Sequence, residues 1–262
     1  MTETRAGFVA LIGEPNAGKS TLLNAMVGAK VAIVTHKVQT TRARIRGVAM
    51  GVAGDETDAE TGDLIGGQKA QIVFVDTPGL FRPRRRLDRA MVAAAWAGAD
   101  DADVICLLIE AHRGLTDGVR AILDALQERA EGRKVALIIN KLARVKAEAL
   151  LALTKEMNEQ REFAATFMIS AEKGHGGETL RAWLAGEMPE GPFLYPEDEI
   201  SDLPLRMIAA EITREKLTLR LHQELPYQLT VETETWKDHK DGSARIEQVI
   251  YVMRDGHKGI VL

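Results

Sequence analysis

A glycine-rich stretch near the start of the chain has the residue types and spacing of a phosphate-binding loop. It reads Gly13-Glu14-Pro15-Asn16-Ala17-Gly18-Lys19-Ser20-Thr21 and fits G-x-x-x-x-G-K-[ST]. In such a loop, consecutive backbone N–H groups converge on phosphate oxygens, and glycines let the backbone come close. Lys19 would place a cation between the β- and γ-phosphates, and the Ser20 hydroxyl would ligate Mg²⁺.

The flanking residues predict the elements that must position this loop. Phe8 to Ile12 form an apolar run of strand length, as expected of a strand buried on both faces of a parallel sheet. Leu22, Leu23, Met26 and Val27 follow at helical spacing. A strand, a glycine-rich turn and a helix in this order supply the context that the pattern requires.

A candidate metal ligand follows a second predicted strand, where Gln71 to Val75 lead into Asp76-Thr77-Pro78-Gly79. A carboxylate at a strand end can hold Mg²⁺ through water, and Gly79, without a Cβ, can approach a γ-phosphate. Asp76 could instead be a turn residue, but its distance along the chain from the phosphate loop favours the metal role. Leu80 stands where the Ras pattern places the Gln that orients water, so hydrolysis would use another group.

Two polar segments each allow two interpretations. The stretch from Thr35 to Arg42 predicts a mobile loop in which a threonine could complete the Mg²⁺ shell, or else an ordinary surface loop. The arginine cluster from Arg82 to Arg89 could contact nucleic acid or phosphate, or could be an exposed helix start.

Alternating strand and helix patterns complete the first part of the chain. Predicted strands at 104–109, 134–139 and 166–169 are followed by helices from about 117, 146 and 177. This order predicts an α/β fold with a doubly wound, mostly parallel P-loop NTPase sheet. Ligands of such sheets bind beyond the carboxyl ends of the strands. Asn140-Lys141 and Ser170-Ala171-Glu172 lie at two such ends, where they could converge on a base.

The composition changes near Glu187, where prolines and a glycine accumulate. We therefore predict a nucleotide-binding domain at 1–187, a linker at 188–203 and a small α+β unit at 204–262. The small unit is expected to hold one helix, at 204–223, and two strands, at 227–236 and 244–253. The apolar positions on one face of that helix are Leu205, Ile208, Ile212 and Leu219.

The overall composition excludes several classes of protein. With 45% hydrophobic and 27% charged residues, the chain is expected to be globular. The single Cys106 lies in an apolar run, so no disulfide framework is possible and we expect a buried thiol in a reducing cytoplasm. No apolar stretch approaches the length of a membrane span, and no signal peptide is recognisable, so we expect a soluble protein.

The motifs GEPNAGKST, QTTR, DTPG, NK and SAEKG, in this order, resemble those of translation-factor-class GTPases. The later stretches AEITREK, ELPY and VETE make the whole chain similar to the bacterial Era family, in which a GTPase domain precedes a KH domain. The resemblance implies hydrolysis of GTP to GDP and phosphate, binding of small-subunit (16S) ribosomal RNA and a role in 30S assembly. It also implies a cytoplasmic, monomeric protein with a loose peripheral contact to the inner membrane.

The resemblance also implies roles for individual residues. Gly13 to Thr21 would hold the phosphates, with Mg²⁺ ligated by Ser20 and Thr41 and with Asp76 in its second shell. Gly79 would sense the γ-phosphate, and the base would be surrounded by Asn140, Lys141 and Ser170 to Glu172. Family members that lack the catalytic Gln resemble potassium-activated GTPases, in which the loop Asn, here Asn16, helps to hold K⁺ near the phosphates.

One departure from the family lies at the base. The family pattern NKxD is written here as Asn140-Lys141-Leu142-Ala143, and Ala143 cannot accept hydrogen bonds from guanine N1 and N2. Losing that carboxylate costs on the order of 2–4 kcal/mol and weakens discrimination between bases. We therefore expect reduced guanine preference. Together with Leu80, this leaves open a non-hydrolysing or base-promiscuous assembly module.

A second departure lies in the last segment. KH folds clamp nucleic acid with a GXXG loop, which Era-like chains place just after the strand and turn found here at 253–261. The sequence ends at Leu262, before that loop, and residues 197–262 carry 9 Lys and Arg against 13 Asp and Glu. This segment lacks the basic footprint of an RNA-binding domain. We expect a partial, type II KH-like unit with weak RNA binding.

Overall fold

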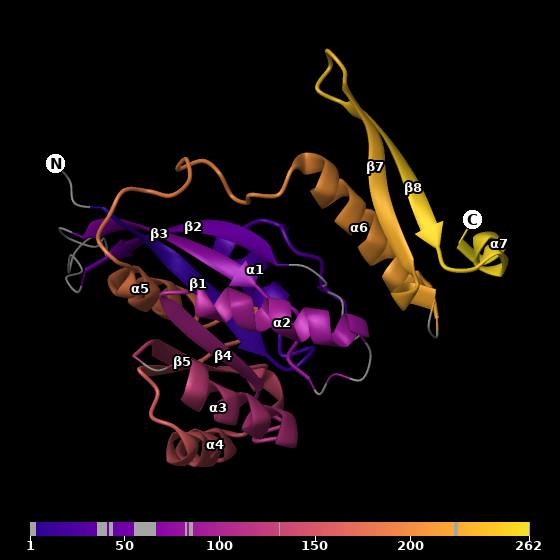
Figure 1. Ribbon diagram of the computed structural model, residues 1–262. Coiled ribbons are helices and arrows are strands. Elements are labelled where there is room, and N and C mark those ends of the chain that lie inside the picture. The colour runs from indigo at the N-terminus through magenta and orange to yellow at the C-terminus, as the bar shows by residue number, and fades with distance from the viewer. Residues whose placement is uncertain are drawn as a thin grey trace.

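In the computed structural model, the apolar runs form a six-stranded sheet in the order β2-β3-β1-β4-β5-β6 (Figure 1). Its strands are β1 (Arg5–Gly13), β2 (Ile45–Ala53), β3 (Gln68–Asp76), β4 (Val104–Glu110), β5 (Lys134–Asn140) and β6 (Ala165–Met168). Only β2 runs antiparallel to its neighbour among these strands. The central strands are buried on both faces, which explains their continuous apolar sequence. The predicted mostly parallel, doubly wound sheet is confirmed.

Helices cover both faces of the sheet. One core cluster joins the sheet to α1 (Lys19–Val27) and α5 (Gly177–Glu187). The other joins it to α2 (Arg86–Asp100), α3 (Asp117–Arg129) and α4 (Ala147–Gln160). Successive residues of a strand point to opposite faces, so each central strand contributes to both clusters.

The structure describes residues 4–35, 41, 44–54, 67–81, 83, 86–130, 132–222 and 225–261. Within the predicted mobile loop, it describes Thr35 and Thr41; residues 36–40 and 42 lie outside the described residues. Arg82, Arg84 and Arg85 of the arginine cluster also lie outside them. None of the described helices is both long and apolar enough to cross a lipid bilayer.

Four strands of the sheet end at one edge with a residue of chemical interest. The last residues of β1, β3, β4 and β5 are Gly13, Asp76, Glu110 and Asn140. Parallel strands bring their carboxyl ends together, and ligands of open α/β sheets bind at that edge. The topology therefore gathers residues that lie far apart in the sequence around the phosphate loop.

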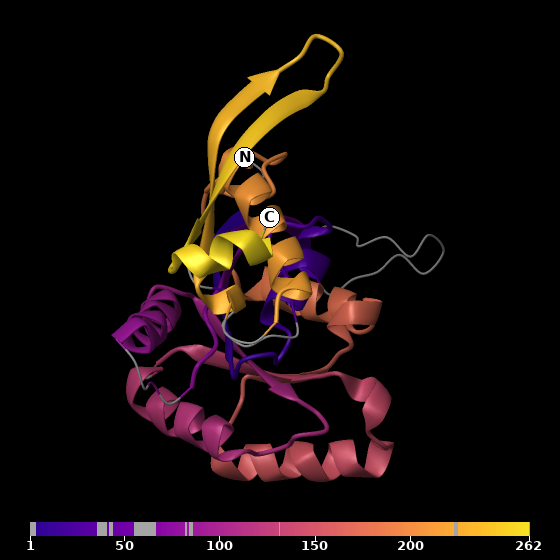
Figure 2. The same cartoon turned by 90° about the vertical axis from the view of Figure 1, so that its right-hand side faces the viewer.

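The C-terminal unit consists of α6 (Leu205–Arg220), the hairpin β7 (Leu229–Asp238) and β8 (Ala244–Val252), and the short α7 (Lys258–Val261), with the turns η3 (Leu225–Tyr227) and η4 (Asp255–His257). The hairpin packs on α6 and its tip projects away from the sheet (Figures 1 and 2). The predicted helix and strands are therefore present, with slightly shifted ends.

The apolar face predicted for α6 is not its buried face. Leu205 is 66% exposed, and Ile212 and Leu219 are also exposed. The buried residues are Ala210, Arg214, Glu215 and Thr218. Because α6 lies between the hairpin and the α/β unit, these two neighbours decide which side of the helix is buried. That buried side includes the charged residues Arg214 and Glu215.

The segment at 188–203 lies along the sheet rather than apart from it. The Val48 N–H donates to the Ile200 carbonyl at 3.0 Å, and Ser201 Oγ donates to the Arg46 carbonyl at 2.8 Å. The buried side chain of Gln71 accepts the N–H of Tyr195 at 2.9 Å. The segment thus covers the free edge of β2, which would otherwise present unpaired backbone groups. The domain boundaries at 187 and 204 stay a prediction.

Candidate nucleotide-binding site

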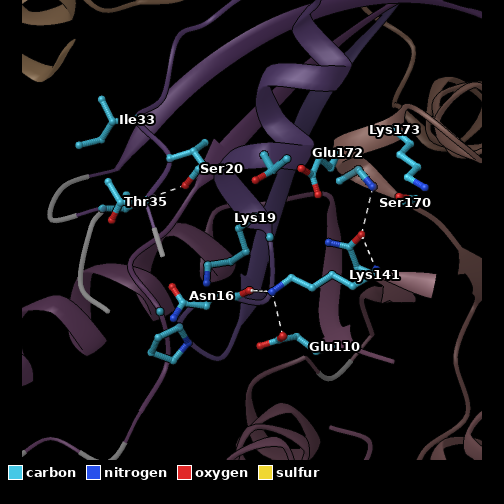
Figure 3. A pocket seen from close by; sticks show the side chains of 18 of the residues that line it. Asn16, Lys19, Ser20, Ile33, Thr35, Glu110, Lys141, Ser170, Glu172 and Lys173 are labelled. Atoms are coloured by element: carbon cyan, nitrogen blue, oxygen red, sulfur yellow. Dashed lines mark hydrogen bonds and ion pairs between the residues drawn. The ribbon is translucent and has the colours of Figure 1, made fainter. Parts of the chain in front are cut away.

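A cavity of about 610 Å³ opens at the carboxyl edge of the sheet (Figure 3). This volume suits a ligand of nucleotide size. The predicted residues that line it are Pro15, Asn16, Gly18, Lys19, Ser20, Thr21, Thr41, Thr77, Gly79, Asn140, Lys141, Ala143, Ser170, Ala171 and Glu172. The other predicted residues, which do not line it, are Gly13, Glu14, Ala17, Asp76 and Pro78. The structure therefore brings together most of the proposed site.

The phosphate loop turns tightly around the ammonium group of Lys19. Lys19 is buried, and its Nζ donates to the carbonyls of Gly13 and Glu14, each at 3.1 Å. Burial lowers the pKa of Lys19 to about 8, against the attraction of Asp76 and Glu14. Gly18 has φ of 102°, and a Cβ there would lie 2.2 Å from Asn140 Nδ2, so only glycine fits.

Three oxygen-bearing side chains meet beside this loop. Ser20 Oγ donates to Asp76 Oδ2 at 2.6 Å and lies 3.0 Å from Thr41 Oγ1. Thr41 Oγ1 also donates to Asp76 Oδ2, at 3.3 Å. The chain thus brings the two predicted hydroxyl ligands and the predicted carboxylate into direct contact.

The environment of Asp76 fits a divalent cation. Its side chain is fully buried, and Oδ1 has no hydrogen-bond partner among the residues that the structure describes. Burial raises the pKa of Asp76, opposed by Lys19 and by the hydroxyls of Ser20 and Thr41. Magnesium binds hard oxygen ligands and keeps several waters. An unsatisfied carboxylate oxygen next to two hydroxyls is suited to hold such an ion through water.

The segment after Asp76 approaches the phosphate loop closely. A Cβ on Gly79 would lie 2.8 Å from atoms of Pro15, so glycine is required there. The Leu80 N–H donates to the Gly13 carbonyl at 2.9 Å, while the Leu80 side chain is buried in the core. Leu80 therefore supports the loop and cannot orient a water molecule. The Thr77 hydroxyl also stabilises this segment, because it donates a hydrogen bond to the Leu11 carbonyl at 2.7 Å.

Asn140 connects the phosphate loop to the loops of the base end. Its Nδ2 donates to the Ala17 carbonyl at 2.9 Å. Its Oδ1 accepts the N–H of Ala171 at 3.1 Å and that of Lys141 at 2.8 Å. An amide side chain can both donate and accept, so this buried asparagine joins three loops with one group.

Lys141 spans the cavity between the phosphate loop and β4. Its Nζ donates to the Asn16 carbonyl at 2.6 Å and to Glu110 Oε2 at 2.8 Å (Figure 3). The methylene stem of Lys141 thereby lies along the cavity, where an apolar surface can support a planar base. Ala143 lines the same end and is exposed, and its methyl group offers no acceptor to a base.

Some cavity residues were missed by reasoning from the sequence. They are Ile33, Val34, Glu110, His112 and Lys173. The strand-end rule that indicated Asp76 and Asn140 would also have indicated Glu110, the last residue of β4. Conversely, the Glu14 carboxylate faces away from the cavity and accepts the Thr116 hydroxyl at 2.9 Å, at the start of α3. Glu14 contributes its backbone to the site.

The C-terminal unit also contains a literal G-x-x-G, at Gly256-His257-Lys258-Gly259. It lies in η4 and at the start of α7, and neither glycine has a positive φ. This stretch is helical, so it differs from the open clamp loop of a KH fold.

Comparison with known proteins gives consistent results. The profile of a family described as "50S ribosome-binding GTPase" matches residues 8–141. The GTPase Era of Dinoroseobacter shibae is 72% identical over 260 residues, which cover 99% of this chain and 79% of that protein. The GTPase Era of Agrobacterium fabrum is 58% identical over 259 residues, covering 99% and 76%.

Two solved structures are also similar. A variant of Aquifex aeolicus Era bound to GDP.AlF4- has a TM-score of 0.84 at 34% identity, covering 98% of this chain and 82% of that one. Era in complex with MgGDPNP and nucleotides 1506–1542 of 16S ribosomal RNA has a TM-score of 0.83, with the same identity and coverage. Because the similarity extends over the sheet and the C-terminal hairpin alike, the chain belongs to the Era family of GTPases.

Proposed function

We propose that this chain binds GTP with Mg²⁺, hydrolyses it to GDP and phosphate, and binds 16S ribosomal RNA in the assembly of the 30S subunit. The observation that carries the nucleotide part is the buried Asp76 carboxylate beside the hydroxyls of Ser20 and Thr41, with one oxygen unpartnered among the described residues. The RNA part is supported by similarity to the Era complex that contains 16S nucleotides.

The chain's own residues would divide the work at the phosphates. Lys19 and the backbone N–H groups of the loop bind phosphate oxygens, and Ser20 and Thr41 orient the metal ion. When bound, Mg²⁺ would supply positive charge that stabilises the phosphates during transfer. Gly79 lines the cavity, packed so closely on Pro15 that a Cβ would not fit, and its N–H would serve the γ-phosphate.

Hydrolysis in this chain needs a group other than the Gln of the Ras pattern. The Leu80 side chain is buried, and Asn16 lines the cavity beside Lys19. We propose that Asn16 helps to hold a potassium ion near the β- and γ-phosphates, where a second cation stabilises developing charge. The test is turnover in KCl against NaCl: Asn16→Asp is expected to abolish the difference, and an unchanged potassium dependence contradicts this role.

A second candidate function is a nucleotide-dependent assembly module with relaxed base choice, which Ala143 favours. Titration calorimetry with GDP, IDP and ADP, each with Mg²⁺, separates the two. We expect binding of GDP and IDP with similar affinities, since the chain lacks the carboxylate that reads guanine N2. Strong GDP preference contradicts the relaxed site. Phosphate release with Mg²⁺ and KCl then decides between a hydrolase and a non-hydrolysing module.

RNA binding by residues 1–262 is expected to be weak. Residues 197–262 carry a net charge of −4, whereas sequence-independent RNA affinity comes mainly from basic residues on phosphates. Fluorescence anisotropy with a 16S 3′-end oligonucleotide at two salt concentrations measures this directly. Tight binding with a steep salt dependence contradicts the expectation.

A further inference from the structure

A carboxylate of the C-terminal unit reaches into the wall of the nucleotide cavity. Glu215 lies on α6 and is 3% exposed. Its Oε1 accepts the backbone N–H of Val34 at 2.9 Å, and its Oε2 pairs with the ammonium group of Lys30. These contacts join residues 181 and 185 positions apart in the chain.

The partners of Glu215 lie next to the phosphate end of the site. Val34 and Thr35 both line the nucleotide cavity, on the side where Figure 3 shows Ser20 and Thr35 close together. Thr41, also on this side, lies 3.0 Å from Ser20 Oγ. A shift of the Val34 backbone would therefore alter the wall nearest the metal and the γ-phosphate.

Glu215 is held as a charged group. Burial tends to raise its pKa, but the hydrogen bonds from Lys30 and the Val34 N–H outweigh burial and hold the pKa below its ordinary value. A buried carboxylate is tolerated only when its oxygens are paired. The position of Val34 relative to α6 is thus well determined.

Residues that follow Thr41 in the sequence also contact the segment that leads into α6. The Arg46 side chain pairs with Asp202 at 3.2 Å, and the Arg46 carbonyl accepts the Ser201 hydroxyl at 2.8 Å. Ser201 and Asp202 lie a few residues before α6. Contacts before and after Thr41 therefore both lead to residues 200–215. Figure 1 shows α6 beside the α/β unit along this side.

We propose that Glu215 is a positioning residue for nucleotide binding: from α6 it fixes Val34 and thereby sets the affinity for a nucleoside triphosphate. A diphosphate depends less on this wall, because it lacks the γ-phosphate. The C-terminal unit would in this way contribute a group to the GTPase site that the α/β unit does not contain.

The experiment measures Mg²⁺-dependent binding of fluorescent GDPNP and GDP to the full chain and its variants. Glu215→Ala is expected to weaken GDPNP binding by about tenfold and GDP binding by less than about twofold, as for loss of a hydrogen bond to a charged group. Lys30→Ala, which keeps the bond to Val34, is expected to have a smaller effect. The double variant is expected to match Glu215→Ala, since both changes act on one contact.

Glu232→Gln is the matched control, because this glutamate is exposed on β7 and the substitution removes the same charge. It is expected to leave both affinities unchanged. If Glu215→Ala does not fold, Glu215→Gln provides the comparison, with the same direction and a smaller ratio. Equal effects on GDPNP and GDP, or no effect on either, overturn the proposal. Failure of the wild-type chain to bind either nucleotide instead overturns the proposed function.

Discussion

The two ends of the cavity are built in different ways. The phosphate half, formed by Lys19, Ser20, Thr41 and Asp76, is buried or half-buried, and each side chain has protein partners. The base half combines the buried Asn140 with the exposed Ala143, which has no polar group. Residues of the phosphate half therefore have structural contacts of their own, whereas the side chain at position 143 is exposed and apolar.

The two halves of the cavity therefore differ in how much a substitution costs the folded protein. Replacing Asp76 or Asn140 would leave buried partners unsatisfied and would cost stability as well as binding. At position 143 the side chain is an exposed methyl group, which forms no hydrogen bonds, so a change there is expected to cost the fold little. Base preference can thus be lost while the phosphate site stays intact.

The largest expected effect comes from removing the cation of the phosphate half. Lys19→Ala should weaken binding of GDP, IDP and ADP alike, by about a hundredfold, because each loses the same charged phosphate contact. Titration calorimetry measures the three affinities. The control is Lys155→Ala, an exposed lysine on α4, which should change none of them. A loss of affinity confined to one of the three nucleotides would contradict the division of the cavity into a phosphate half and a base half.

The next effect concerns the base half. Ala143→Asp should strengthen GDP binding by about thirtyfold, roughly 2 kcal/mol, and should strengthen IDP binding less, because IDP lacks the N2 donor. ADP should not gain. Competition against a fluorescent nucleotide gives the ratios. Ala149→Asp, at an exposed position of α4, makes the same chemical change away from the cavity. Equal gains for GDP and IDP would contradict the assigned role of position 143.

A smaller effect is expected at the metal end. Asp76→Asn keeps the size of the side chain but removes its charge, so the Mg²⁺ concentration for half-maximal nucleotide binding should rise about tenfold. The ratios of the affinities for GDP, IDP and ADP should stay the same, because base choice depends on the other half of the cavity. Magnesium titrations of nucleotide binding test this. Asp124→Asn, at an exposed position on α3, serves as the control; a similar change in that variant would point to a general charge effect.

The smallest effect concerns the contact between α6 and the phosphate half. Because the pKa of Glu215 is lowered in the folded protein, its stabilising contribution is complete above the ordinary value of 4.5 and is lost as pH falls through the folded pKa. Glu215→Gln should lower Tm by about 2–4 °C at neutral pH and by less below pH 4.5. Thermal unfolding between pH 7 and pH 3 measures this, and a constant difference would contradict it.

The elements around the phosphate loop were predictable because their signals are local. The apolar run at 8–12, the glycine pattern and the helix that follows each depend on neighbouring residues, and the structure has β1 and α1 at those places. The side of α6 that is buried was not predictable in this way. Leu205 faces solvent while Glu215 is buried, because distant groups such as Lys30 and Val34 decide which side is covered.

Three features of this protein follow directly from its amino-acid sequence: the phosphate-loop chemistry, the alternation of strands and helices, and the absence of a carboxylate at position 143. Those features depend on residue identity and short-range spacing. Three others are set by long-range packing: Glu14 turns away from the cavity, Glu110 pairs with Lys141, and Glu215 accepts the N–H of Val34. Such contacts join residues that only the packing of the sheet and helices brings together, so no local pattern encodes them.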